Sequence, residues 1–191
     1  MQEKIIADIQ ASIGIKTEVS QTLVPQIEKA AKLMIETLRS GNKVLFCGNG
    51  GSAADAQHLA GELVGRFLKE RRALPAIALS TDTSILTCLA NDYSFDIVFA
   101  RQVEALARSR DVVFGLSTSG NSKNVLEAFK KAKERECQTI GLLGGDGGQI
   151  AKLSDIAIIV PSKATPRVQE SHIMIGHILC ALIEDDLFPE K

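Results

Sequence analysis

Short runs of apolar residues recur along the chain, and segments with a helical period separate them. Five such runs occur, at 43–47, 75–79, 111–116, 138–144 and 155–160. Nearly continuous apolar runs are typical of parallel strands, because helices cover both faces of a parallel sheet. The alternation therefore predicts an α/β fold, a three-layer sandwich in which a five-stranded parallel sheet lies between two helical layers.

The segments between these runs carry helical signals, and we expect helices over about 52–67, 82–90, 96–108, 119–135 and 167–187. Residues 1–40 are also expected to be helical, because apolar residues from Leu23 to Leu38 recur at helical spacing and Gly41 follows as a stop. No linker rich in Pro, Gly or Ser interrupts the chain. We therefore interpret residues 1–191 as a single domain with an N-terminal helical extension over 1–40.

Charge and composition exclude several kinds of partner. The formal net charge is −1, no long basic run occurs and Trp is absent, so we expect no nucleic-acid partner. No apolar run approaches the ~20 residues of a membrane span, and the N-terminal residues lack the apolar core of a signal peptide. The four scattered cysteines form no CxxC pair, and we expect all of them to be buried and reduced. We infer a cytoplasmic protein without a membrane partner.

The segment STSGNS, residues 117–122, follows the third predicted strand and is the strongest candidate for a phosphate site. Ligands bind beyond the carboxyl ends of parallel strands, and the helix after this loop offers free N–H groups and the positive end of its dipole. The hydroxyls come from Ser117, Thr118, Ser119 and Ser122. The alternative is a simple helix cap, but four hydroxyls in six residues exceed what one cap needs.

The segment GNGGS follows the first predicted strand, and its glycines match a dinucleotide-binding turn only in part. Its alternative is a tight strand-to-helix turn. The next helix carries His58 and Glu62 four residues apart, and therefore on one face. An exposed polar pair is the alternative there, although the pair follows a loop of the ligand-binding type.

The last predicted helix places Gln169, Glu170, His172 and His177 among apolar residues. The chain has three histidines, and the third is His58. One histidine on an apolar helix is usually a satisfied core residue. Three histidines that converge with a glutamate would suggest a proton-transfer or metal site.

Read in order, the motifs GNGGSAADAQHLAGEL, LANDYSFD, STSGNS, GGDGG and RVQESH…H resemble the sugar isomerase (SIS) family, and within it the phosphoheptose isomerases. The resemblance runs nearly end to end. It implies a homotetramer that converts sedoheptulose 7-phosphate to D-glycero-D-manno-heptose 7-phosphate through an enediol. This reaction is the first step toward ADP-heptose for bacterial surface polysaccharide, with lipopolysaccharide core and capsule both left open.

The resemblance also implies roles for particular residues. Glu62 matches the catalytic base and His177 the acid. One zinc ion per subunit is implied, with His58, Glu62, Gln169 and His177 as ligands; whether it is catalytic or structural stays open. The residues that match substrate-binding positions are Asn49, Gly50, Gly51, Asn91, Asp92, Ser117, Thr118, Ser119, Ser122 and Gln169. The chain departs from the family pattern at Pro166, where an acidic residue is expected, so a substrate contact there is not carried over.

A second reading is a non-catalytic SIS tetramer that binds the replication initiator DnaA. The segments MQEKI, ALPAIAL, TDTSILTCLAND and LFPE resemble the DnaA initiator-associating protein. Glu62 and His177 favour the enzyme, because a binding module has no need of an acid–base pair.

Gln169 and His177 raise a question of geometry. Eight residues of helix span ~12 Å along the axis, so both side chains can hardly reach one ion from one intact helix. Either Gln169 precedes the helix, or the two residues come from different subunits. We therefore predict a site at a subunit interface.

Overall fold

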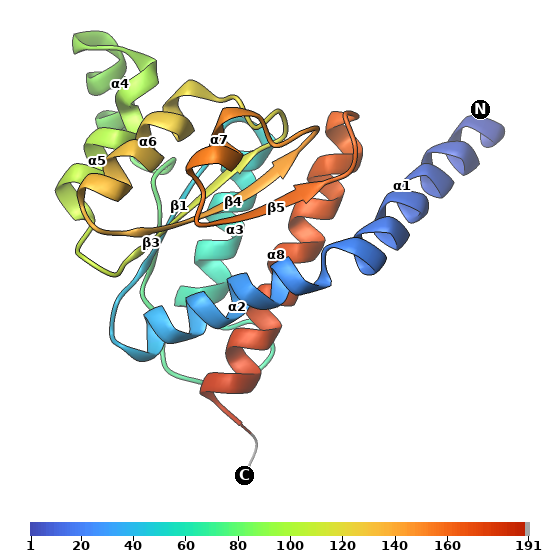
Figure 1. Ribbon diagram of the computed structural model, residues 1–191, viewed down its shortest axis with the longest axis horizontal. Coiled ribbons are helices and arrows are strands. Elements are labelled where there is room, and N and C mark those ends of the chain that lie inside the picture. Colours follow the sequence, from blue (N-terminus) through green and yellow to red (C-terminus); the bar gives the residue numbers. More distant parts are fainter. Residues whose placement is uncertain (190–191) are drawn as a thin grey trace.

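A five-stranded sheet forms the centre of the computed structural model, which describes residues 1–189 (Figure 1). The strand order is β2-β1-β3-β4-β5, and every neighbouring pair is parallel. The strands are β1 (Val44–Cys47), β2 (Ala76–Ala78), β3 (Val112–Ser117), β4 (Gln138–Gly144) and β5 (Ile156–Val160). The parallel pairing confirms the predicted sheet; β1 and β3 are buried along their whole length, whereas the edge strands β2 and β5 are only partly buried.

Helices cover both faces of this sheet, as predicted. One hydrophobic cluster packs α2 (Val24–Arg39), α3 (Gly51–Val64) and α8 (Thr165–Leu187) against one face. A second cluster packs α5 (Val98–Leu106), α6 (Lys123–Glu134) and α7 (Gly148–Leu153) against the other. The helix α4 (Thr83–Asp92) has no buried residue and packs on the 3₁₀ turn η1 (Phe95–Ile97) and on α5. That residues 1–191 form a single domain stays a prediction.

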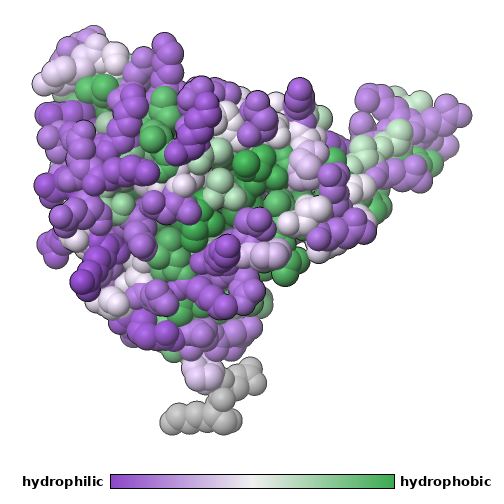
Figure 2. All heavy atoms as spheres, in the orientation of Figure 1, coloured by the Kyte–Doolittle hydropathy of each residue, from purple (hydrophilic) through white to green (hydrophobic). Residues whose placement is uncertain are grey.

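The first helix, α1 (Gln2–Thr22), projects from the body as an arm (Figure 1). Among its 21 residues Val19 alone is buried. Ile5, Ile6, Ile9 and Ile13 are exposed along it, and Figure 2 shows apolar atoms among the polar ones on this arm. The predicted N-terminal helical extension thus consists of two helices, since the helical conformation is interrupted at Leu23 between α1 and α2.

Several predicted boundaries were wrong in informative ways. The helix expected from 119 begins at Lys123, because residues 118–122 form a loop after β3. The helix expected from 167 begins at Thr165, where Pro166 fits the first turn without losing a hydrogen bond. Helix α7 was not predicted, because its glycine-rich start reads as loop.

Cys88 is exposed on α4, so the expectation that all four cysteines are buried was wrong for this one. The other three are buried and free. Burial raises the pKa of the Cys47 thiol to about 12. Among residues 1–189, no helix is long and apolar enough to span a bilayer.

Candidate functional site

The loops after β1 and β3 lie next to each other, because these two strands are neighbours at the centre of the sheet. Asn49 in the first loop and Asn124 in the first turn of α6 exchange two hydrogen bonds, each Nδ2 donating to the other's Oδ1 at 2.8 Å. Asn124 is buried. The turn before α3 is therefore tied to the start of α6. Gly50 lies in the left-handed region, with φ at +56°, which favours glycine.

Ser117, which ends β3, and the loop after it form the segment 117–122, here called loop 117–122, whose hydroxyls are arranged in a way that a helix cap does not explain. Ser122 occupies the N-cap position of α6, but its side chain makes no capping hydrogen bond. Its Oγ instead lies 2.9 Å from Oγ of Ser117. The hydroxyl of Ser119 accepts from the backbone N–H of Asn121 at 3.2 Å. These hydroxyls, next to free N–H groups of α6, form a surface suited to an anion.

A second glycine-rich segment, 144–148, packs against this loop. A Cβ on Gly120 would collide with the backbone of Gly147, and one on Gly148 would collide with Asn121. The backbone N–H of Ile150 donates to the carbonyl of Gly120 at 3.0 Å. These interlocked loops leave no room for side chains, which explains why glycine is required here.

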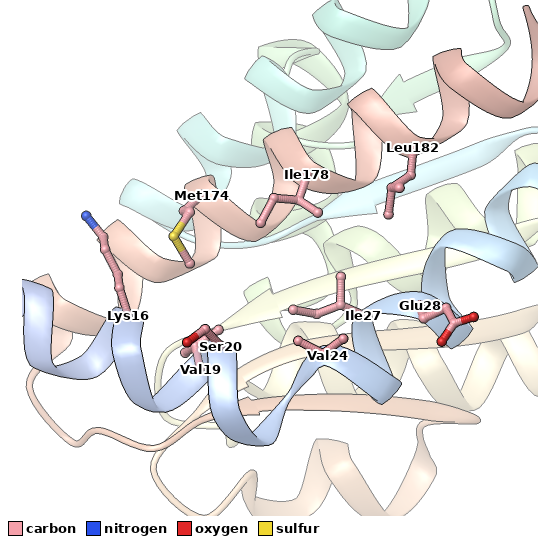
Figure 3. Close-up of a pocket in the computed structure, with 9 residues that line it drawn as sticks. All are labelled: Lys16, Val19, Ser20, Val24, Ile27, Glu28, Met174, Ile178 and Leu182. Carbon is pink, nitrogen blue, oxygen red and sulfur yellow. The ribbon is translucent and has the colours of Figure 1, made fainter. Parts of the chain in front are cut away.

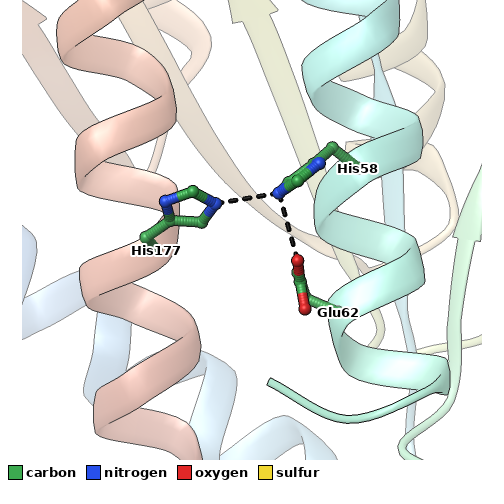
Figure 4. Close-up of side chains that lie close together, drawn as sticks. All are labelled: His58, Glu62 and His177. Carbon is green, nitrogen blue, oxygen red and sulfur yellow. Dashed lines mark hydrogen bonds and ion pairs between the residues drawn. The ribbon is translucent and has the colours of Figure 1, made fainter. Parts of the chain in front are cut away.

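His58, Glu62 and His177 meet between helices α3 and α8 (Figure 4). The Nε2 atoms of His58 and His177 lie 2.8 Å apart, and Nε2 of His58 lies 3.1 Å from Oε1 of Glu62. The side chains of His58 and Glu62 are 46% and 22% exposed, so a ligand can reach them. His58 and Glu62 therefore share one face of α3, as predicted, and His177 from α8 of the same chain lies against that face.

Two residues that the sequence did not single out surround this cluster. The ring of Phe67 stacks on the imidazole of His177, with centroids 5.4 Å apart and planes 28° apart. Asp55 lies one turn before His58 on α3. Burial raises the pKa of the Asp55 carboxyl, while the imidazoles of His58 and His177 oppose that shift. The spacing Asp-x-x-His-x-x-x-Glu would have revealed Asp55, since all three positions share a helix face.

Gln169 lies inside α8, which begins at Thr165. The alternative that Gln169 precedes the helix was therefore wrong. Its side-chain amide lies against the turn before α3, where a Cβ on Gly51 would collide with it. Within one chain, Gln169 thus lies next to the glycine turn before α3, and ~12 Å along the helix axis from His177.

His172 does not join the other two histidines. It is fully buried, and its Nε2 lies 3.1 Å from the carbonyl oxygen of Leu143 on β4. Its Nδ1 is buried without a hydrogen-bond partner. Burial lowers the pKa of His172 to about 4. The idea that three histidines converge is wrong for this one, which is a core residue.

Asn91 and Asp92 end α4 on the surface and bond to each other, with Asn91 Nδ2 donating to Asp92 Oδ1 at 2.9 Å. In the part of the chain that the structure describes, no hydrogen bond joins them to the other predicted site residues. Glu170 pairs with Arg167 at 2.7 Å. The exposed Pro166 precedes that pair in the first turn of α8.

The donor set of the cluster fits a divalent metal ion. Two imidazole nitrogens and a carboxylate oxygen, all within 4.8 Å of one another, can hold one ion and leave a position open. Groups that could ligate a metal or transfer protons thus occur together with a hydroxyl-rich loop at a helix N-terminus, on a parallel sheet covered on both faces. The family model described as SIS domain matches residues 9–144, and the chain therefore belongs to the SIS domain family.

Relatives of known name narrow this class. The chain is 65% identical over 159 residues to the phosphoheptose isomerase of a Nitratiruptor species, covering 83% of this chain and 85% of the relative. It is 56% identical over 188 residues to that of a Geobacter species, covering 98% of each. The structure of phosphoheptose isomerase GmhA from Neisseria gonorrhoeae superposes with a TM-score of 0.92 at 48% identity, covering 96% of this chain and 98% of that one.

Within the SIS domain family, the chain belongs to the phosphoheptose isomerases, and it is an isomerase. The resemblance seen in the sequence is confirmed. The alternative of a DnaA-binding module finds no support in these relatives.

Proposed function

We propose that the chain interconverts sedoheptulose 7-phosphate and D-glycero-D-manno-heptose 7-phosphate through an enediol, which leads toward ADP-heptose. The observation that carries this proposal is the convergence of His58, Glu62 and His177 beside an anion-type loop. Relatives named phosphoheptose isomerase supply the substrate class. A cytoplasmic location belongs to the same proposal, since a charged sugar phosphate does not cross a bilayer unaided.

Glu62 and His177 divide the proton transfers. Isomerisation moves one proton between C1 and C2, and a carboxylate on a helix face reaches both carbons of a short sugar end. Glu62 takes that proton and returns it. His177 moves protons between the two oxygens, because an imidazole both donates and accepts near neutral pH. Phe67 stacks on His177 and limits the orientations of its ring.

Zinc is the metal that this donor set favours. His58, Glu62 and His177 would hold it, and when bound it polarises the sugar carbonyl. Gln169 can be the fourth zinc ligand only if a neighbouring subunit supplies it, because the Gln169 of the same chain lies at the glycine turn. Within its own chain, the position of Gln169 against Gly51 supports a role in substrate binding instead.

The remaining predicted residues bind the sugar and its phosphate. Ser117, Thr118, Ser119 and Ser122 hold the phosphate at the start of α6. Asn49, Gly50 and Gly51 let the sugar approach the backbone. Asn91 and Asp92 lie on a helix with no buried residue, so they serve a site that assembly or closure of α4 completes. Binding energy from the phosphate, remote from the chemistry, holds the sugar in register.

The proposed homotetramer rests on an apolar groove of about 400 Å³ between α1, α2 and α8 (Figure 3). Val24, Ile178 and Leu182 line it and stay 54%, 39% and 40% exposed. Ile5, Ile9 and Ile13 are also exposed on α1, and exposed apolar side chains that gather on one face are typical of a protein–protein interface. We propose that other copies of this chain bind in the groove.

One incubation tests the function. The protein is mixed with sedoheptulose 7-phosphate in deuterated water, and the aldose product and deuterium uptake at C1 or C2 are followed by NMR. We expect both signals, because an enediol exchanges protons with solvent. A wild-type protein that shows neither signal would contradict the proposal.

A further inference from the structure

A buried ion pair lies just behind the proposed reactive cluster, between the loop after α3 and the end of α8. Nε of Arg71 donates to Oε1 of Glu184 at 2.8 Å. Both side chains are only 1% exposed. Buried ions need full hydrogen bonding, so the partners of this pair are informative.

The carboxylate of Glu184 accepts hydrogen bonds from the backbone of the loop that follows α3. Its Oε1 accepts from the backbone N–H of Phe67 at 2.8 Å. Its Oε2 accepts from the N–H groups of Leu68 and Lys69 at 2.7 and 2.9 Å. Burial acts to raise the pKa of Glu184, but these three bonds and Arg71 outweigh it and leave the pKa below its usual value. One carboxylate on α8 therefore fixes three consecutive backbone groups.

Arg71 binds the backbone at the C-terminal end of α3. Its Nη2 donates to the carbonyl oxygen of Glu62 at 2.8 Å, and its Nη1 donates to those of Leu63 and Gly65 at 2.8 and 3.2 Å. These carbonyls have no partners within the helix, and a cation there also interacts favourably with the helix dipole. The guanidinium thus contacts the backbone of Glu62 itself.

The same loop reaches His177. Phe67, whose N–H is bound by Glu184, stacks its ring on the His177 imidazole. Arg71 therefore touches the residue that carries the proposed base, and Glu184 holds the residue that stacks on the proposed acid. Glu184 also lies seven residues after His177 on α8, so it is on the same helix face.

We propose that Arg71 and Glu184 are positioning residues for catalysis, which set the distance between Glu62 on α3 and His177 on α8. The inference rests on the proposed function of this cluster. Neither side chain reaches the sugar; each acts through the groups it holds. A misplacement of about 1 Å costs catalysis ~10²-fold in well-organised sites, so such a pair has a large effect without touching substrate.

The chain offers a matched control at the other end of the sheet. Lys43 and Asp111 also form an ion pair, 2.5 Å apart, in which Asp111 is 1% and Lys43 18% exposed. Asp111 also accepts from backbone N–H groups, those of Lys43 and Arg108. That pair precedes β1 and β3, far from the loops that bind ligand. Asp111→Asn therefore weakens a comparable pair without disturbing α3 or α8.

The experiment compares Arg71→Lys, Glu184→Gln and Asp111→Asn by their kcat and KM for sedoheptulose 7-phosphate, at a temperature where circular dichroism shows each variant folded. Lysine keeps the charge but cannot reach three carbonyls and Glu184 together. We expect kcat to fall at least ~10-fold in the first two variants, with KM within about twofold because loop 117–122 is untouched. In Asp111→Asn we expect kcat to stay within about twofold.

A second readout is independent of turnover. With only three histidines in the chain, the imidazole proton resonances can be assigned individually. The His177 lines carry a ring-current shift from Phe67, which we expect to shrink in Arg71→Lys and Glu184→Gln at fixed pH without metal, while the His172 lines stay in place. If wild type does not turn over the sugar, the proposed function fails, and this readout alone decides the positioning role.

Two results would overturn the inference. One is a kcat in Arg71→Lys and Glu184→Gln that falls no further than in Asp111→Asn. The other is a His177 ring-current shift that both variants keep. Should neither variant fold, Phe67→Leu decides, because it keeps the backbone bond to Glu184 and removes the stack. An unchanged kcat in Phe67→Leu would then remove the link to His177 and the inference with it.

Discussion

Asn49 and Asn124 join the turn after β1 to the start of α6 through a reciprocal pair of amide hydrogen bonds, both 2.8 Å long. Asn49 belongs to the turn before α3 and Asn124 to the first turn of α6, 75 residues later. The proposed sugar and phosphate positions therefore do not move independently.

Replacing Asn124 by alanine should raise KM for the phosphosugar. Leaving the Asn49 amide without its partner costs ~1–3 kcal/mol, which corresponds to roughly 5- to 150-fold if it is all expressed in binding. Steady-state kinetics measure the effect. Asn42→Ala is the control, because Asn42 bonds to Ser109 and Asp111 at the far end of the sheet. An equal KM in both variants would contradict the coupling.

Replacing Glu62 by glutamine should lower isomerisation by ~10²–10⁴-fold, the usual cost of losing a general base. The phosphosugar should still bind, because loop 117–122 is unchanged. Deuterium uptake from solvent and calorimetric binding measure the two effects separately. Glu70→Gln is the control, since Glu70 is exposed and pairs only with Arg66 in the described residues. If Glu62→Gln keeps its rate, the base is another group, and His177 is the next candidate.

Replacing His58 by alanine should lower the affinity for zinc at least ~10-fold, because it removes one of the three donors that face one another. A competition titration of metal-free protein with zinc and a chromophoric chelator gives the affinity. His172→Gln should bind zinc as wild type does, since that histidine bonds to Leu143 in the core. Equal affinities for His58→Ala and wild type would place the metal elsewhere.

His172 should make stability depend on pH. Its pKa is lowered to about 4 in the folded chain, below the ~6.5 of an unfolded histidine. Between these values the unfolded state binds more protons, so stability falls as pH drops, by on the order of 1 kcal/mol per pH unit. Urea unfolding at pH 7 and pH 5 measures this loss. His172→Gln should lose less stability over that range, and an equal loss in both proteins would refute the assignment.

Replacing Ile178 by glutamate should break the proposed tetramer, because it places a charge in the groove between α1, α2 and α8. Light scattering should give four times the 20.5 kDa chain mass for wild type and a smaller particle for the variant. Leu106→Glu is the matched control, with 40% exposure against 39% for Ile178. A wild-type particle of one chain mass would end the tetramer proposal.

The sheet was predictable because strands that helices cover on both faces have nearly continuous apolar sequences. The pairing of His58 with Glu62 was equally local, a matter of helical spacing. The approach of His177, by contrast, depends on how α8 packs on α3, which no local pattern encodes. The same holds for Arg71 and Glu184, which are 113 residues apart and read as ordinary charged residues.

Helix α7 and the start of α6 were missed for a different reason. Glycines and serines signal loops, and the segments around 117–122 and 144–148 contain little else. Only the structure shows that the loops support each other, and that this contact orders the first turns of both helices.

The interlocked loops also bear on the heat of binding. The carbonyl of Gly120 is already bound by Ile150, and the side chain of Asn121 accepts from Gln149 at 3.1 Å, before any ligand arrives. A phosphate that binds at the proposed site therefore meets backbone whose torsions are fixed in advance, and little conformational entropy remains to be lost there. In a calorimeter, the entropy change of phosphosugar binding should come from released water and from the sugar itself, and scarcely from the polypeptide.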